Sequence, residues 1–177
     1  MAHTTPSHPT PSPPPPTTYG WIGIGNMGYG MAMNIARKIP ATAHLLINDL
    51  RQDQVAKFLA EAVDEHGLDP AKVSAVDAPA EIVQRAEIIL TSLPHDEAVK
   101  EVFENAETGI IAGLSRPTHP EEHTQGHNST VKLVLETSTI APTTTLPLHE
   151  AITAMGTHTL TRQSRVAFLQ PQPEHSP

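Results

Sequence analysis

The chain has 177 residues, which is the size of one ordinary domain with extensions. Its formal net charge of −8 argues against nucleic acid or an anionic membrane as the main partner. Without cysteine, neither a disulfide framework nor a thiolate metal site can form. No apolar run approaches the roughly 18 residues that a membrane span needs. The N-terminus has neither a secretory apolar region nor an Arg-rich transit pattern, so a cytoplasmic location is the default expectation.

Residues 1–18 are almost wholly Pro, Thr, Ser and His, and they include the run from Pro13 to Pro16. Such a composition cannot bury apolar area, so we expect an extended, disordered tail. It could act as a ligand for proline-binding domains. A plain solvated extension is the favoured interpretation, because composition alone supports the other one.

From Tyr19 onward, strand patterns alternate with helical patterns. The expected strands are residues 19–23, 44–48, 73–76, 87–93 and 131–136, and the expected helices are 26–38, 52–65, 78–85, 96–103 and 145–155. This alternation predicts parallel βαβ units. The expected fold is α/β, a Rossmann-type doubly wound, mostly parallel sheet with helices on both faces, over residues 19–156.

Two helices carry apolar positions at helical spacing. Met27, Met31 and Ile35 share one stripe of the first helix. The candidate buried positions of the last helix are Leu146, Leu148, Ile152 and Met155.

The glycines between the first strand and first helix form a G-x-G-x-x-G pattern in the segment Ile22-Gly-Ile-Gly-Asn-Met-Gly28. Gly23 permits the tight turn after the strand, Gly25 removes a side chain where a pyrophosphate approaches, and Gly28 allows close helix–strand packing. The free amides at the helix start would face the phosphates. The pattern predicts a dinucleotide site.

Asp49 ends the second expected strand, 21 positions after Gly28. An acidic residue there accepts hydrogen bonds from an adenosine ribose and repels a 2′-phosphate, which favours NAD. Arg51 lies two positions on, and its guanidinium could instead receive the phosphate of NADP. The alternative role for Asp49 is a cap of the helix that begins near Gln52.

Hydroxyl side chains follow the fifth expected strand. Ser138 and Thr139 come at the carboxyl end of an apolar strand, and ligands of open α/β sheets bind at that edge. The alternative is an ordinary Ser/Thr turn that caps the next helix.

A polar segment, residues 115–130, separates the fourth helix from the fifth strand. His119, His123 and His127 are spaced as metal ligands on one helical face would be. Pro117, Pro120 and Gly126 make a continuous helix there unfavourable, so a flexible surface insertion without a metal is favoured.

Three motifs together resemble the β-hydroxyacid dehydrogenases. They are the glycine segment, the segment Leu90-Thr-Ser-Leu-Pro94 with the residues after it, and Glu136-Thr-Ser-Thr-Ile-Ala-Pro142. The closest type is similar to 3-hydroxyisobutyrate dehydrogenase, and 6-phosphogluconate dehydrogenase has the same cofactor domain. The resemblance covers about residues 19–156, and it implies NAD(P)-dependent oxidation of a small 3-hydroxy acid. By the same analogy, a mitochondrial location is an alternative to the cytoplasm.

The resemblance assigns a role to each matching position. It implies that the pyrophosphate lies at the backbone of Gly23, Ile24, Gly25, Asn26, Met27 and Gly28. It implies that Leu93 and Pro94 lie against the ribose and nicotinamide, and that Thr139 contacts the cofactor near the nicotinamide. Ser138 would bind the carboxylate or hydroxyl of the substrate.

The resemblance ends near Gly156. Family members continue from the last helix into a strand, a glycine-rich substrate loop and a separate helical domain that supplies a lysine as the general acid/base. Here no glycine follows Gly156 and no lysine follows Lys132, so no catalytic residue is assigned, and 157–177 is expected to be a divergent, disordered tail. Two hypotheses remain open: the cofactor domain of a dehydrogenase that lacks its catalytic domain, and a dinucleotide-binding module or inactive fragment without turnover.

Overall fold

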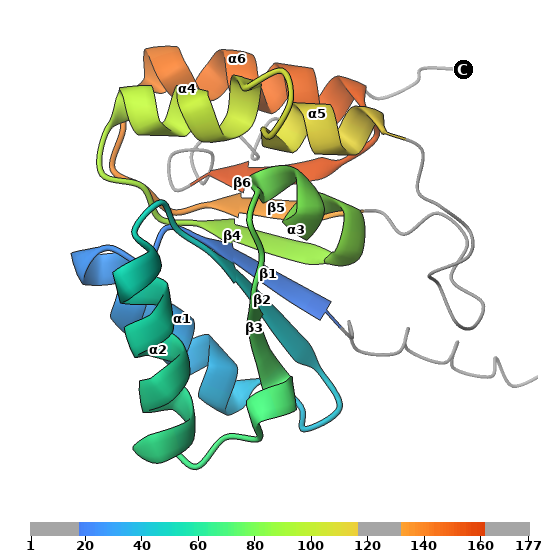
Figure 1. The fold of residues 1–177 in the computed structure, drawn as a ribbon. Coiled ribbons are helices and arrows are strands. Elements are labelled where there is room, and N and C mark those ends of the chain that lie inside the picture. The colour runs from blue at the N-terminus through green and yellow to red at the C-terminus, as the bar shows by residue number, and fades with distance from the viewer. Residues whose placement is uncertain (1–17, 117–131, 162–177) are drawn as a thin grey trace, which may run out of the picture.

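The computed structural model describes residues 18–116 and 132–161. Within these residues, six strands form one parallel sheet in the order β3-β2-β1-β4-β5-β6 (Figure 1). The strands are β1 (Thr18–Ile22), β2 (His44–Asn48), β3 (Val73–Ala75), β4 (Ile88–Thr91), β5 (Leu133–Glu136) and β6 (His158–Thr161). The strand order reverses between β1 and β4, where doubly wound folds open a crevice for ligands. The expected fold class is confirmed.

Helices cover both faces of the sheet (Figure 1). The first face carries α1 (Asn26–Lys38) and α2 (Gln52–Asp64), and a 3₁₀ turn (Pro70–Lys72) precedes β3. The other carries α3 (Pro79–Arg85), α4 (Asp96–Glu104), α5 (Ile110–Ser115) and α6 (Pro142–Ala154). Alternate side chains of each strand enter opposite cores: Trp21 lies with α1 and α2, and Ile22 lies with the other four.

The apolar stripe expected on α1 is only partly confirmed, because Ile35 is half-buried against the core but the two methionines are exposed. Met27 is 71% exposed and Met31 is 37% exposed, whereas the buried face consists of Gly28, Ala32, Met33 and Ala36. Small residues let this helix approach the sheet closely. On α6, Leu148 and Ile152 are buried as expected, but Leu146 and Met155 are exposed, so that half of the prediction is wrong.

Three elements were not expected from the sequence: the 3₁₀ turn before β3, helix α5 and strand β6. Helix α5 has only six residues, and strand β6 continues the sheet past Gly156, where the sequence suggests that the domain ends. The buried residues around the start of β6 are Thr157 and Thr159, so no apolar alternation marks the strand. His119, His123 and His127 lie outside the described residues, as do residues 1–17 and 162–177. Within the described ranges, no helix is both long and apolar enough to cross a bilayer.

Candidate functional site

The turn after β1 requires glycine at two positions. Gly23 has a φ of +91°, which L side chains rarely adopt, and a Cβ there would lie 2.3 Å from the carbonyl oxygen of Ser92. A Cβ on Gly28 would lie 2.1 Å from the carbonyl oxygen of Gly23. Helix α1 therefore starts directly against the turn that follows β1, as the sequence predicts.

Gly25 differs from these two glycines because the space beside it is open. A Cβ there would meet only Nη2 of Arg51, at 4.0 Å. Gly25 is the N-cap of α1, no side chain caps it, and the next residues, Asn26 and Met27, are exposed. In the described part of the chain, the amides of Asn26 and Met27 have no hydrogen-bond acceptor. The positive end of the helix dipole thus faces an open space.

The Asp49 side chain contacts both this glycine loop and Arg51, the residue just before α2. Its Oδ2 accepts a hydrogen bond from the amide of Ile24 at 2.8 Å, and its Oδ1 accepts one from the amide of Arg51 at 2.8 Å. The N-cap of α2 is Arg51, and no side chain caps that helix. The capping alternative for Asp49 is therefore wrong. Arg51 Nε lies 3.7 Å from Asp49 Oδ1, so a carboxylate and a guanidinium both lie beside the loop.

The ends of β4 and β5 meet on the other side of the glycine loop. The amide of Leu93 donates to the hydroxyl oxygen of Ser138 at 2.8 Å, and Ser138 is buried, whereas Pro94 and Thr139 are exposed. The N-cap of α6 is Ala141, whose amide donates to Asp96, and the Ser138 oxygen accepts from Leu93, so the capping alternative is wrong for Ser138.

The residues expected from the sequence therefore form one continuous row along the carboxyl edge of the sheet. Asp49 contacts Ile24, and Gly23 packs on Ser92, which precedes Leu93; Leu93 in turn bonds to Ser138. Lys132 lies elsewhere: its Nζ donates to the carbonyl oxygen of Ala86 at 2.9 Å, at the opposite edge, before β4 and β5 begin. Burial lowers the pKa of this lysine.

Sequence reasoning missed two features near this edge. Glu136 is buried at the end of β5, and the signal was a single charged residue in an apolar strand, on the face of Val134. Asp96 accepts a hydrogen bond from the amide of Ala141, and its hydrogen bond with Thr144 lowers the pKa of the Asp96 carboxyl. These contacts join the starts of α4 and α6.

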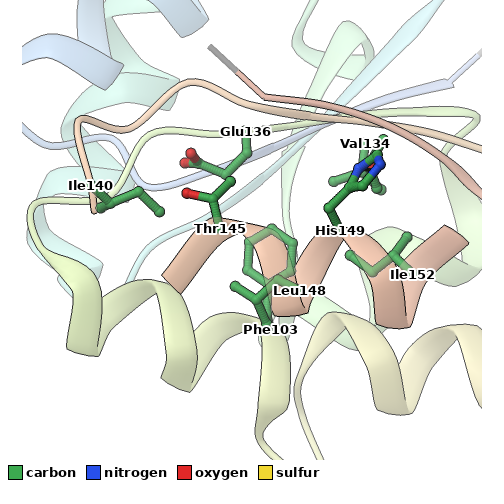
Figure 2. A pocket seen from close by; sticks show the side chains of 9 residues that line it. Phe103, Val134, Glu136, Ile140, Thr145, Leu148, His149 and Ile152 are labelled. Atoms are coloured by element: carbon green, nitrogen blue, oxygen red, sulfur yellow. Dashed lines mark hydrogen bonds between the residues drawn. The ribbon is translucent and has the colours of Figure 1, made fainter. Parts of the chain in front are cut away.

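A small, partly open cavity with room for about one water molecule lies between the sheet and α6. Figure 2 shows Glu136 extending from β5 into the space above α6, where Thr145 and His149 also point. The remaining lining residues are Phe103, Val134, Ile140, Leu148, Ile152 and Thr159. His149 and Thr159 are hydrogen-bonded through Nδ1 and Oγ1. Among the described residues, no group of three or more His, Asp or Glu side chains is arranged to hold a metal ion.

The strand order, the glycine turn and the acidic residue after β2 define a dinucleotide-binding domain of the Rossmann type. The family model for the NAD binding domain of 6-phosphogluconate dehydrogenase matches residues 18–162. The chain belongs to this family.

Two curated dehydrogenases are similar in sequence to most of this chain. The chain is 32% identical over 127 residues to the probable mitochondrial 3-hydroxyisobutyrate dehydrogenase of Dictyostelium discoideum. This match covers 72% of this chain and 31% of that protein. The chain is 31% identical over 136 residues to the NAD-dependent L-serine dehydrogenase of Pseudomonas aeruginosa, covering 77% of this chain and 36% of that protein. The chain thus spans about a third of the length of these curated relatives.

A solved structure shares the fold. The 3-hydroxyisobutyrate dehydrogenase of Mycobacterium tuberculosis with L-serine is similar with a TM-score of 0.57 and 23% identity, over 82% of this chain and 39% of that one. At this identity the structure shows the shared fold, whereas the family model and the sequence relatives identify the chain as an NAD(P)-binding domain of the 3-hydroxyisobutyrate dehydrogenase-like type.

Proposed function

We propose that the carboxyl edge of the sheet binds NAD(H), with the pyrophosphate at the backbone from Gly23 to Gly28. The observation that carries this proposal is the contrast among the three glycines. Protein atoms fill the space beside Gly23 and Gly28, whereas the space beside Gly25 is open and lies at the start of α1. A helix N-terminus with free amides stabilises an anion there.

The other half of the cofactor extends toward β4 and β5. Leu93, Pro94 and Thr139 would lie against its ribose and nicotinamide, and Ser138 would donate to the carboxylate or hydroxyl of a small hydroxy acid. Support comes from the hydrogen bond between Leu93 and Ser138, which keeps the two strand ends together. When bound, the nicotinamide exchanges a hydride with its substrate. In the whole protein, the proposed activity is hydride transfer between a 3-hydroxy acid and NAD(P).

A second candidate function is dinucleotide binding without turnover. Oxidation of an alcohol needs a base for its proton, and a positioned base contributes about 10²–10⁴-fold. Lys132, the last lysine of the chain, is half-buried at the opposite edge. We therefore expect the isolated chain to bind NADH but not to reduce NAD⁺ with 3-hydroxyisobutyrate or L-serine, as followed by NADH absorbance. Turnover would favour the enzyme over the binding module.

We further propose a preference for NAD over NADP. The Asp49 carboxylate is held beside the glycine loop by the amides of Ile24 and Arg51, where a ribose hydroxyl can donate to it and a 2′-phosphate would be repelled. The NAD-dependent relative is consistent with this choice. The competing feature is the exposed guanidinium of Arg51, which could bind that phosphate.

The Asp49→Asn variant tests this preference, because the amide keeps the size of the side chain and removes its charge. We expect wild type to bind NADH more tightly than NADPH, and we expect the variant to bind NADPH better and NADH several-fold more weakly, by titration calorimetry. Arg51→Ala is the matched comparison. If Arg51→Ala weakens NADPH alone and Asp49→Asn changes neither ligand, NADP is the cofactor. If wild type binds neither ligand, the proposed function is wrong.

A further inference from the structure

Glu136 is a buried carboxyl group at the end of a core strand. It is only 5% exposed and faces α6, on the same side of β5 as Val134. Burying a carboxyl group is unfavourable unless polar partners replace water. Two such partners are present: Oε1 accepts hydrogen bonds from the Thr91 hydroxyl at 3.3 Å and from the Ser138 amide at 2.8 Å. Both bonds end on the same oxygen.

Further hydrogen bonds extend this contact to the loop after β4. The amide and the hydroxyl of Thr137 both donate to the carbonyl oxygen of Thr91, at 3.0 Å and 2.7 Å. The amide of Leu93 then donates to Ser138 Oγ at 2.8 Å. These bonds link the turn after β5 to the loop after β4, and Glu136 bonds to both segments through Ser138 and Thr91.

These contacts hold the hydroxyl oxygen of Ser138 in place. A hydroxyl group has one proton to donate and two lone pairs. One lone pair of Ser138 receives the Leu93 amide, so this bond does not use the hydroxyl proton. The Ser138 amide is meanwhile held by the carboxyl oxygen of Glu136.

We infer that Glu136 is a positioning residue for the nicotinamide end of the proposed site. Its buried carboxyl group holds the Ser138 amide and the Thr91 hydroxyl, and so it fixes the Ser138 hydroxyl and the Leu93 amide where the cofactor and the hydroxy acid meet. This inference rests on the proposed function. The hydrogen bonds of Asp49 at the adenosine end are made to Ile24 and Arg51, so Glu136 acts on one half of the cofactor only.

The test compares two substitutions and two ligands. The amide oxygen of Glu136→Gln can accept both hydrogen bonds, whereas Glu136→Leu accepts neither. NADH contains the nicotinamide, and ADP-ribose lacks it. For Glu136→Leu we expect the Kd for NADH to rise about tenfold, the effect of losing one to two ordinary hydrogen bonds, while the Kd for ADP-ribose stays within about twofold. For Glu136→Gln both values should stay within about twofold of wild type.

Equal weakening of NADH and ADP-ribose by Glu136→Leu would show general damage and would overturn the inference, and so would unchanged NADH binding. If Glu136→Leu does not fold, Thr91→Val removes one donor and keeps a β-branched shape, and it should weaken NADH alone. Hydrogen exchange at the Leu93 amide, measured without ligand, tests the role of Glu136 independently of the proposed function. Exchange should be faster in Glu136→Leu than in Glu136→Gln even if wild type binds neither ligand, and equal exchange would contradict the coupling.

Discussion

Replacing Gly28 by alanine should lower the free energy of unfolding by about 1–3 kcal/mol, the usual cost of overpacking. The added Cβ would lie 2.1 Å from the carbonyl oxygen of Gly23 and 3.2 Å from Cβ of Ser92. A backbone carbonyl cannot rotate away as the end of a flexible side chain can. Helix α1 must therefore shift away from the turn, and NADH binding should be lost with it. Denaturant unfolding followed by circular dichroism measures the first effect.

Gly30→Ala is the matched control, because Gly30 lies two residues further along the same helix. A Cβ there meets nothing within 4 Å. Since alanine is the better helix former, this variant should be more stable than wild type, by up to about 1 kcal/mol. Equal stability of the two variants would contradict the close contact between α1 and the turn after β1.

The Gly25→Ala variant should weaken NADH binding strongly while changing the stability of the fold only slightly. Gly25 has φ −66° and ψ −167°, an extended conformation that alanine adopts without strain, and a Cβ would meet only Arg51 Nη2 at 4.0 Å. Alanine is a poorer N-cap than glycine, so we expect a stability loss of no more than about 1 kcal/mol. The methyl group would occupy the space proposed for the pyrophosphate, so NADH affinity should fall at least about tenfold, or 1.4 kcal/mol.

Calorimetric titration with NADH and thermal unfolding of the same samples measure both quantities for Gly25→Ala. Gly30→Ala again serves as the control, with unchanged NADH affinity expected. A Gly25→Ala protein that binds NADH as wild type does would mean that the phosphates lie elsewhere. A large loss of stability would mean that the space beside Gly25 is not open.

The glycine turn and the elements around it could be predicted because local chemistry determines them. Helix α1 and strand β2 have the predicted bounds, since a glycine-rich turn and short buried strands have strong sequence signals. The stripe of Met27 and Met31 misled because the helix packs on the sheet through small residues, whose periodicity apolar patterns do not reveal. Strand β6 was missed because the buried residues at its start, Thr157 just before the strand and Thr159 within it, are not apolar.

The hydrogen-bond partners of the site could not be predicted. The hydrogen bond between Ser138 and Leu93 joins residues 45 positions apart, across a strand pairing that sequence spacing alone does not define. The position of Arg51 beside Gly25 likewise depends on the tertiary contact between the loops after β1 and β2.

Fluorescence of Trp21 tests the central claim most directly. It is the only tryptophan of the chain, it is fully buried in β1, and its Nε1 donates to the carbonyl oxygen of Gly23 at 2.9 Å. Reduced nicotinamide absorbs where tryptophan emits, so NADH bound at the glycine turn would quench Trp21 and emit in its place. Saturable quenching in wild type and Gly30→Ala, and its loss in Gly25→Ala, is the predicted result. Quenching that never saturates and is equal in all three proteins would contradict a dinucleotide site at this turn.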